Sequence, residues 1–214
     1  MAPGRADWAR APRLCFLSPS NQYPTGAVLS LPRRRAILEE AARCGAWIIE
    51  DDYDNELRYH KHPLAPLFGL STANRVIYLG TFTKVMFPGL RLAYLVIPPD
   101  LVDPLSAGLA ELYRAGRLAE QSALADFIAD GHLGAHIRRM REVYMERQAA
   151  LRSAIDDLLG DQVTASGGRA GIHLLYYFNG LGEDAAVAAD ALAEGIVARP
   201  LSHYYLEGRT GAAV

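Results

Sequence analysis

Four short apolar runs, separated by polar loops and one helical segment, constrain the fold most strongly. Residues 14–17, 46–50, 75–80 and 91–98 each hold an apolar stretch of strand length, and most lack the alternation typical of a strand with one wet face. Residues 32–43 repeat their apolar side chains at helical spacing, ahead of a glycine that is placed to end the helix. This order predicts an α/β fold with a sheet covered on both faces.

The second half of the chain has a different character. Two long helical patterns cover residues 101–129 and 133–159. A strand-like run at 171–178, a helix-like segment at 184–194 and a strand-like run at 195–200 follow. We therefore expect connecting helices and then a smaller α/β unit.

Composition excludes several classes of protein. The 22 Lys and Arg against 24 Asp and Glu leave a net charge of -2, which argues against a surface built for nucleic acid or an anionic membrane. Cys15 and Cys44 are too few for a disulfide framework and are predicted to be reduced. No run is long and apolar enough for a signal peptide or a membrane span, so a cytoplasmic protein is expected.

Two loops at the predicted carboxyl ends of strands carry the chemistry, because open α/β sheets bind their ligands there. The first holds Asp51 and Tyr53, and the second holds Thr81, Lys84 and Arg91. A partly desolvated lysine amine is a nucleophile for an aldehyde. Hydroxyls and a guanidinium suit a phosphate, and a carboxylate suits a protonated pyridine nitrogen.

Six ordered segments make a resemblance specific: SPSNQYPTG, IIEDDYDNELRY, VIYLGTFTKVMFPGLRLAYLV, DFIADGHLGAHIRRMREVY, AGIHLL and PLSHYY. From about Leu14 to its end, the chain resembles the aminotransferase-like domain of MocR/PdxR-type regulators, a branch of the GntR family related to class I aminotransferases. The resemblance implies a partial fold-type-I, pyridoxal-phosphate-dependent transferase. Residues 1–98 are then the carboxyl-terminal part of the large domain, and residues 99–214 are connecting helices and an incomplete small domain.

The resemblance also implies roles for individual residues. Lys84 matches the lysine that holds pyridoxal 5'-phosphate as a Schiff base, the internal aldimine. Asp51 matches the aspartate that pairs with the pyridine nitrogen, and Tyr53 matches the tyrosine whose hydroxyl approaches the ring oxygen. Thr81 and Arg91 match positions that contact the phosphate.

There are departures from the family pattern. Asn21 stands where the family usually has histidine; it lies in a loop like that of the ring-facing asparagine of many aminotransferases, but Tyr23 shifts the register. The family's domain is longer on both sides, and its winged-helix DNA-binding domain is not expected in this sequence.

Three functions stay open on this basis. In the first, the chain binds pyridoxal phosphate and takes part in amino-group transfer in an intact, homodimeric parent. In the second, it is the effector-sensing domain of a transcription regulator and responds to a small amine or amino acid without binding DNA itself. In the third, it is an inactive fragment.

Some polar residues have a simpler interpretation. Asp52 and Asp54 are expected to be solvated loop carboxylates or a helix cap. His173 lies in an apolar run and is expected to be a satisfied core histidine within a strand.

The basic run Arg138, Arg139 and Arg141 is predicted to be structural rather than a nucleic-acid site, because a short basic run on a helix is usually a solvated face. His60 and His62 suggest a metal site, but no third ligand lies at a suitable spacing. They are predicted to be exposed loop histidines, and no metal site is expected.

Overall fold

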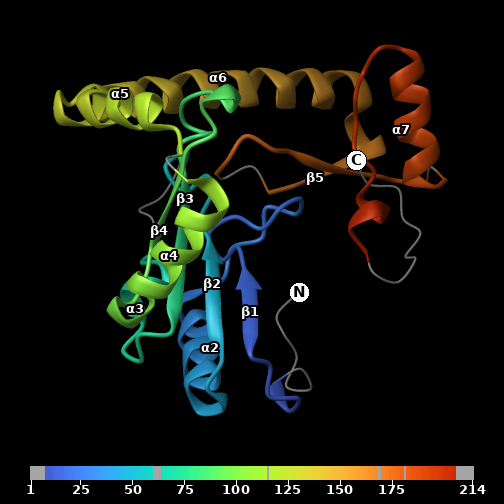
Figure 1. Cartoon of the computed structure of the whole chain (residues 1–214). Helices are drawn as coiled ribbons and strands as arrows, with labels where there is room; N and C mark the ends of the chain where they lie inside the picture. Colours follow the sequence, from blue (N-terminus) through green and yellow to red (C-terminus); the bar gives the residue numbers. More distant parts are fainter. Residues whose placement is uncertain (1–7, 60–63, 115, 168–169, 181, 206–214) are drawn as a thin grey trace.

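A four-stranded sheet forms the base of the molecule (Figure 1). The computed structural model describes residues 8–59, 64–114, 116–167, 170–180 and 182–205. Strands β1, β2 and β3 pair in parallel, and β4 pairs antiparallel to β3 in the order β1-β2-β3-β4. The strands span Leu14–Leu17 (β1), Trp47–Asp51 (β2), Val76–Thr81 (β3) and Ala93–Val96 (β4).

Helices and a small hairpin complete the chain. The connection between β1 and β2 is α2, and α3 precedes β3. The helices are α2 (Leu31–Cys44), α3 (Leu67–Leu70), α4 (Val102–Tyr113), α5 (Leu118–Ala129), α6 (His132–Leu159) and α7 (Asp184–Ala193). The hairpin joins β5 (Val163–Ser166) to β6 (Leu175–Phe178).

Helix α2 forms where the sequence predicts it. Its first turn contains a proline, and Gly45 ends it in the left-handed conformation, with φ at 71° and its N–H directed to the last carbonyls. Ile37 and Ala41 face the sheet and pack in one buried cluster with Ile48 and Val76. The apolar spacing of the helix therefore corresponds to the face that it buries.

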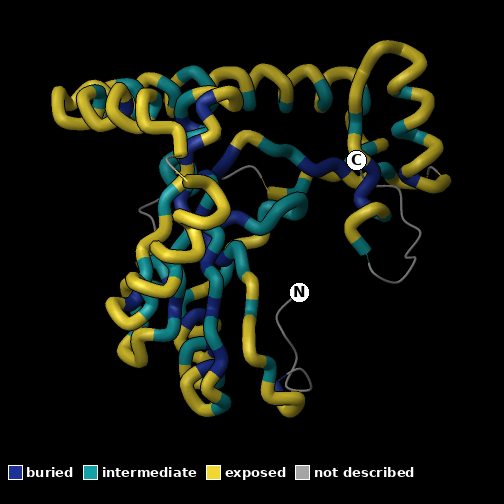
Figure 2. The backbone as a smooth tube through the Cα atoms, in the orientation of Figure 1, coloured by how far each residue is buried: buried dark blue, intermediate teal, exposed yellow. Residues whose placement is uncertain are grey.

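Burial is uneven across the sheet (Figure 2). The edge strand β1 leaves Leu14 55% and Phe16 61% exposed, whereas Ile48 of β2 and Val76 of β3 are buried. The expectation of a sheet covered on both faces is thus wrong for the edge. Cys15 and Cys44 are free and partly buried.

Two predictions for the second half need correction. The run at 195–200 is not a strand in this structure, and His173 lies in an irregular segment just before β6 rather than inside a strand. Strand β5, which the sequence did not predict, pairs antiparallel with β6. No helix among the described residues is long and apolar enough to span a membrane.

Helix α6 lies across the upper end of the sheet, towards which the β1 and β2 arrows point (Figure 1). His136 of α6 reaches the loop after β3, where Nε2 lies 2.8 Å from the carbonyl oxygen of Val85. The predicted helical stretch 101–129 is broken between α4 and α5. The carboxyl ends of the parallel strands thus lie beneath the long helix.

A buried ion pair joins α2 to the sheet. Arg34 and Glu50 have fully buried side chains, with 3.8 Å between Nη1 and Oε1. The Arg34 guanidinium also donates to the carbonyls of Pro19, Leu29 and Ala65. Glu50 accepts from the first two backbone N–H groups of α3. Burial lowers the pKa of the Arg34 guanidinium and raises the pKa of the Glu50 carboxyl. The attraction between the two charges and the backbone hydrogen bonds to Glu50 oppose these shifts.

We expect Arg34→Met to lower the free energy of unfolding by about 3–5 kcal/mol, because it leaves Glu50 buried without its partner. For a chain of this length that is roughly a 10 °C fall in the thermal midpoint, measured by circular dichroism. Arg33→Met on the exposed side of the same helix is the matched control. Equal midpoints for the two variants would contradict this account of Arg34.

Candidate functional site

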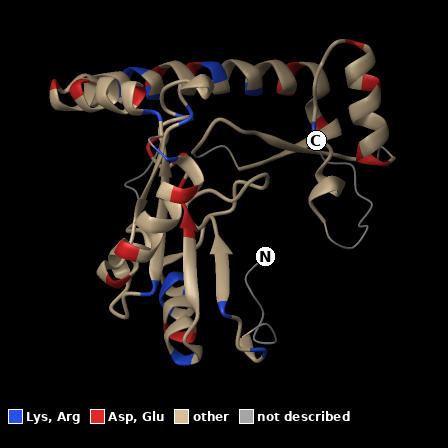
Figure 3. Ribbon diagram, in the orientation of Figure 1, with Lys and Arg blue, Asp and Glu red and all other residues tan. Residues whose placement is uncertain are grey.

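The predicted site residues gather at the carboxyl ends of β2 and β3. Asp51 is the last residue of β2, and Thr81 is the last of β3, opposite in register to Ala93 of β4. Figure 3 shows the acidic tip of β2 at this end of the sheet. Tyr53 and Lys84 follow within three residues of these strand ends. The parallel pairing of β2 with β3 therefore brings both predicted loops to one edge.

A tight hydrogen-bonded turn holds Lys84. The Thr83 N–H donates to Thr81 Oγ1 at 3.2 Å, and that hydroxyl donates to the carbonyl of Leu92 at 3.3 Å. The Met86 N–H closes the turn onto the Phe82 carbonyl at 2.9 Å. Lys84 itself is partly exposed, so its amine is accessible from a turn that the backbone fixes.

Arg91 precedes β4 and is exposed. Its backbone is left-handed, with φ at 53°, a conformation that favours glycine. Among the described residues it forms no side-chain hydrogen bond or ion pair.

The acidic cluster after β2 is buried, which corrects the expectation of solvated carboxylates. Asp52 is 2% and Asp54 1% exposed. Asp52 accepts from the Tyr78 hydroxyl at 2.8 Å, and its second oxygen has no partner among the described residues. Asp51 is only half-buried, and burial followed by the charge of Asp52 raises the pKa of its carboxyl. Of the three aspartates, Asp51 is thus the most accessible.

Tyr53 carries a buried hydroxyl that has no hydrogen-bond partner among the described residues. Burial, with smaller contributions from Asp54 and Asp51, raises the pKa of this phenol far above its ordinary value. A buried, unpaired hydroxyl is costly unless a ligand satisfies it. Tyr53 is therefore a neutral phenol whose hydroxyl no other group uses in the described part of the chain.

The side-chain amide of Asn21 already forms a hydrogen bond within the protein. Its Nδ2 donates to Asp54 Oδ2 at 2.6 Å, and both side chains are buried. Burial raises the pKa of Asp54 to about 7, although the bond from Asn21 opposes the shift. The structure therefore brings the other five predicted site residues to one end of the sheet but turns the Asn21 amide towards Asp54.

Gly171 rests directly on this pair. Its φ is +74°, and an added Cβ would lie 2.2 Å from Asp54 Oδ2 and 2.3 Å from Asn21 Nδ2, which leaves no room for a side chain. The Gly171 N–H donates to the Leu57 carbonyl at 2.8 Å, and its own carbonyl accepts from the Tyr59 hydroxyl at 2.7 Å. We call the contact of Gly171 with Asn21 and Asp54 the glycine joint. It connects the sheet to the hairpin unit.

His173 follows two residues later and is not a satisfied core histidine. Its Nδ1 is buried without a hydrogen-bond partner among the described residues. Its ring meets the ring of Tyr23 edge to face, with 4.7 Å between centroids. Burial, then the charges of Lys84 and Arg199, lower the pKa of the imidazole. Sequence reasoning did not expect the His173 ring to keep an unpaired nitrogen.

Tyr23 links the loop after β1 to the end of the described chain. Its hydroxyl lies 2.9 Å from that of Tyr204, which belongs to the short 3-10 helix η4 (Leu201–Tyr204). Burial, followed by the contact with Tyr204, raises the pKa of the Tyr23 phenol. The tyrosine that complicated the register of Asn21 therefore faces His173 and the hairpin unit.

The other polar residues of the sequence analysis play different parts. Arg141 donates from Nε to the Glu56 carbonyl, while Arg138 and Arg139 are exposed on α6. His60 and His62 lie outside the described residues.

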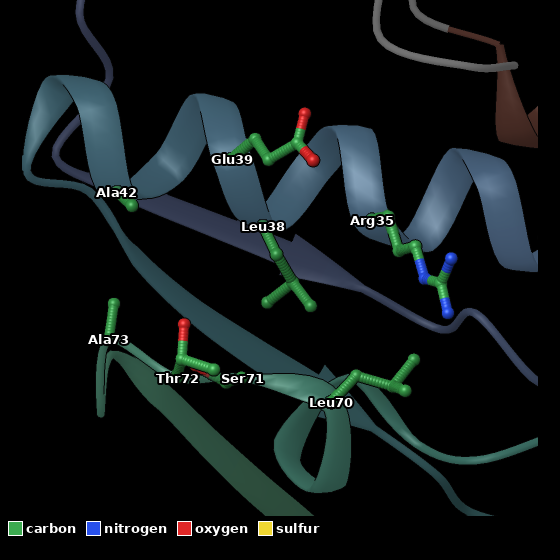
Figure 4. A pocket seen from close by; sticks show the side chains of 8 residues that line it. All are labelled: Arg35, Leu38, Glu39, Ala42, Leu70, Ser71, Thr72 and Ala73. Carbon is green, nitrogen blue, oxygen red and sulfur yellow. The ribbon is translucent and has the colours of Figure 1, made fainter.

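A groove of about 230 Å³ lies away from this site (Figure 4). It runs between α2 and the segment after α3, near the amino ends of β2 and β3. Its lining combines short and aliphatic side chains with the exposed pair Arg35 and Glu39. The chemistry of the predicted residues is at the opposite end of the sheet, so the groove is no part of the candidate site.

Comparison with known proteins identifies the family. The family described as aminotransferase class I and II matches residues 9–212. The chain belongs to this family. The curated relatives include transcription regulators, as the sequence motifs implied. The chain is 40% identical over 197 residues to the uncharacterized HTH-type transcriptional regulator YhdI of Bacillus subtilis. The match covers 92% of this chain and 42% of that protein.

A second regulator is similarly close. The probable rhizopine catabolism regulatory protein MocR of Rhizobium meliloti is 38% identical over 195 residues, which cover 91% of this chain and 40% of that protein. The chain thus spans about two fifths of the length of these curated relatives. The predicted resemblance to MocR-type regulators is confirmed.

Solved structures confirm the fold-type-I prediction. The α-aminoadipate aminotransferase LysN of Thermus thermophilus, solved with N-(5'-phosphopyridoxyl)-L-leucine, superimposes with a TM-score of 0.85 at 27% identity, over 94% of this chain and 52% of that one. The kynurenine aminotransferase of Pyrococcus horikoshii gives 0.85 at 24% identity, over 94% of this chain and 50% of that one. At 24% identity, the likeness to the kynurenine aminotransferase shows the fold alone. This aminotransferase domain therefore has the architecture of about half an aminotransferase chain.

The glycine joint predicts a pH dependence of stability. Because the pKa of Asp54 is raised from its ordinary 3.8 to about 7 in the fold, its contribution to stability is complete below about pH 4 and is lost as pH rises through about 7. Asp54→Asn keeps an acceptor for Asn21 and removes the titration. We expect it to flatten the fall in stability between pH 5 and pH 8, which in the wild type amounts to about 3 kcal/mol of unfolding free energy.

Asp190→Asn, at an exposed position of α7, is the matched control. Parallel stability profiles for wild type and Asp54→Asn would show that Asp54 titrates normally.

Proposed function

We propose that this aminotransferase domain binds pyridoxal 5'-phosphate, with Lys84 as the residue that holds it covalently. The observation that carries the proposal is the unpartnered, buried Tyr53 hydroxyl, which lies at the same end of the sheet as the accessible Lys84 amine and the half-buried Asp51 carboxyl. The lysine amine can react with an aldehyde, the tyrosine hydroxyl can donate to a phenolic oxygen, and the carboxyl group can pair with a pyridine nitrogen. When bound, the cofactor supplies the electron sink for chemistry at an amine's α-carbon.

The surrounding residues have defined parts in this proposal. Asp51 accepts a hydrogen bond from the protonated pyridine nitrogen, and Tyr53 donates to the ring oxygen. Arg91 is exposed and supplies a guanidinium for the phosphate. Thr81 already bonds within the turn, so its hydroxyl exchanges the Leu92 carbonyl for a phosphate oxygen if it takes part. Asn21 contributes to the ring only if it leaves Asp54.

A second candidate function rests on the regulators among the relatives. In it, the same covalent chemistry at Lys84 detects a small amine or amino acid inside a transcription regulator, with no net turnover. Release of a keto or aldehyde product from an amine substrate separates catalysis from sensing. In either case we propose a homodimeric, cytoplasmic parent, with the domain boundary near residue 98.

Lys84→Ala tests the cofactor proposal directly. The chain contains two lysines, Lys61 and Lys84, so the background of lysine modification is small. After incubation with pyridoxal phosphate and reduction with borohydride, we expect mass spectrometry to find the phosphopyridoxyl group on Lys84 in the wild type. We expect it to be absent from the Lys84→Ala protein and retained on Lys84 in Lys61→Arg. Labelling that persists after Lys84→Ala, or that is confined to Lys61, would refute the assignment.

Asp51→Asn tests the pyridine contact separately. The trapped adduct should still form on Lys84, but the affinity for pyridoxal phosphate should fall by about 10-fold to 100-fold, because a charge-assisted hydrogen bond contributes about 1.5–3 kcal/mol. Fluorescence titration of the cofactor measures the change. Asp103→Asn, exposed in the first turn of α4, serves as the control. An unchanged affinity in Asp51→Asn would remove Asp51 from the site.

A further inference from the structure

The alternation of side chains along β2 decides which face of the sheet Asp51 occupies. Ile48 packs in one buried cluster with Ile37 of α2, so its side of the strand is the face that this helix covers. We call it the helix face. Successive residues of a strand point to opposite faces, and Asp51 lies three residues after Ile48. The Asp51 carboxyl therefore belongs to the other face of the sheet, which we call the site face.

Thr81 lies on the site face together with Asp51. Asp51 pairs in register with Leu79 of β3, and partners in register point to the same face. Thr81 follows Leu79 by two residues and thus points to that face as well. Its hydroxyl accepts from the Thr83 N–H at 3.2 Å and so holds the turn that carries Lys84. The face that Asp51 presents is therefore the face from which Lys84 is held.

Asp52 is held to the helix face by the neighbouring strand. Its backbone N–H donates to the Leu79 carbonyl at 3.0 Å, which continues the pairing of β2 with β3 by one residue. Its buried carboxylate accepts from the Tyr78 hydroxyl at 2.8 Å. Tyr78 pairs in register with Glu50, so it points to the helix face. Because adjacent residues of an extended chain point to opposite faces, this hydrogen bond keeps Asp51 on the site face.

The ring of Tyr78 has two aromatic neighbours that fix its position. The Phe68 ring meets it edge to face with 6.4 Å between centroids, and the Tyr94 ring lies at 6.2 Å. Tyr94 in turn occupies the space beside Gly80, where an added Cβ would lie 2.2 Å from Tyr94 Cζ. The missing side chain of Gly80 thus makes room for the aromatic group that stands next to Tyr78.

We propose that Asp52 and Tyr78 are positioning residues for the cofactor, and that their hydrogen bond holds the Asp51 carboxyl where it meets the pyridine nitrogen. The inference rests on the proposed function and gives a part in it to two residues on the opposite face of the sheet. In the described part of the chain, the Tyr78 hydroxyl is the one side-chain partner of Asp52, whose other oxygen is unpaired. Loss of that hydroxyl should therefore loosen the segment after β2 and leave the turn of Lys84 intact.

A double-mutant cycle tests whether Tyr78 acts through Asp51. Tyr78→Phe removes the hydroxyl and keeps the ring, and fluorescence titration should show an affinity for pyridoxal phosphate about 10-fold below that of the wild type. In the Asp51→Asn background the same change should alter the affinity by less than about 2-fold, because both changes remove one contact. Asp52→Asn keeps an oxygen for the Tyr78 hydroxyl and should retain most of the affinity. Tyr177→Phe, at an exposed tyrosine of β6, is the matched control.

The absorbance of the Lys84 adduct gives a readout that a general loss of stability does not move. A positive charge on the ring nitrogen lowers the pKa of the nitrogen that joins Lys84 to the cofactor. Tyr78→Phe should therefore raise the pH midpoint of the absorbance change by about one pH unit, towards that of Asp51→Asn. Additive losses of affinity in the double variant, or an unchanged midpoint in Tyr78→Phe, would overturn the inference.

Hydrogen exchange tests the same contact without the cofactor. Tyr78→Phe should speed exchange of the Asp52 N–H by about 10-fold. The Ile48 N–H, which donates to the Arg75 carbonyl at 2.9 Å at the other end of the strand pair, should exchange as in the wild type. Equal acceleration at both positions would show a general destabilisation and count against a positioning role. Failure of the proposed function is distinct, because it appears as no trapped adduct on Lys84 in the wild type, and the inference then falls with it.

Discussion

The buried contact between Arg34 and Glu50 is the constraint on which the rest of the structure depends. An arginine removed from water is tolerated only when its donors are satisfied, and here three carbonyls and a carboxylate surround it. The carbonyls of Pro19 and Leu29 come from the loop before α2, and that of Ala65 comes from the segment before α3. These contacts also fix the backbone beside the candidate site, because Pro19 precedes Asn21 by two residues and Glu50 precedes Asp51 by one.

Charge is distributed asymmetrically around the candidate site. The loop after β2 contributes the buried carboxyl groups of Asp52 and Asp54, whereas the segment between β3 and β4 contributes the positive charges of Lys84 and Arg91.

The sequence predicted the parts of the fold that depend on local pattern. Helix α2, its glycine end and the three parallel strands follow from apolar spacing and from short-range steric rules. Lys84 and Asp51 were found through motifs, and the strands that they follow or end, β3 and β2, pair in parallel and end at the same edge of the sheet. Strand β5 was missed because the alternation of VTAS is weak, and residues 195–200 were wrongly predicted as a strand because their apolar content alone does not supply a partner strand.

Residues whose environment depends on distant segments could not be predicted. Asp54 is buried because Asn21 and Gly171 cover it, and neither is near it in the sequence.

The pairing of Tyr23 with Tyr204 joins residues that are 181 positions apart. Closing so long a loop costs roughly 4–5 kcal/mol in chain entropy, whereas the βαβ unit that presents Asp51 closes far shorter loops. We therefore expect the sheet that carries Lys84 to form from neighbouring segments before Tyr23 meets Tyr204 during folding. The contact between the two tyrosines is thus the part of this region whose formation depends on most of the described chain.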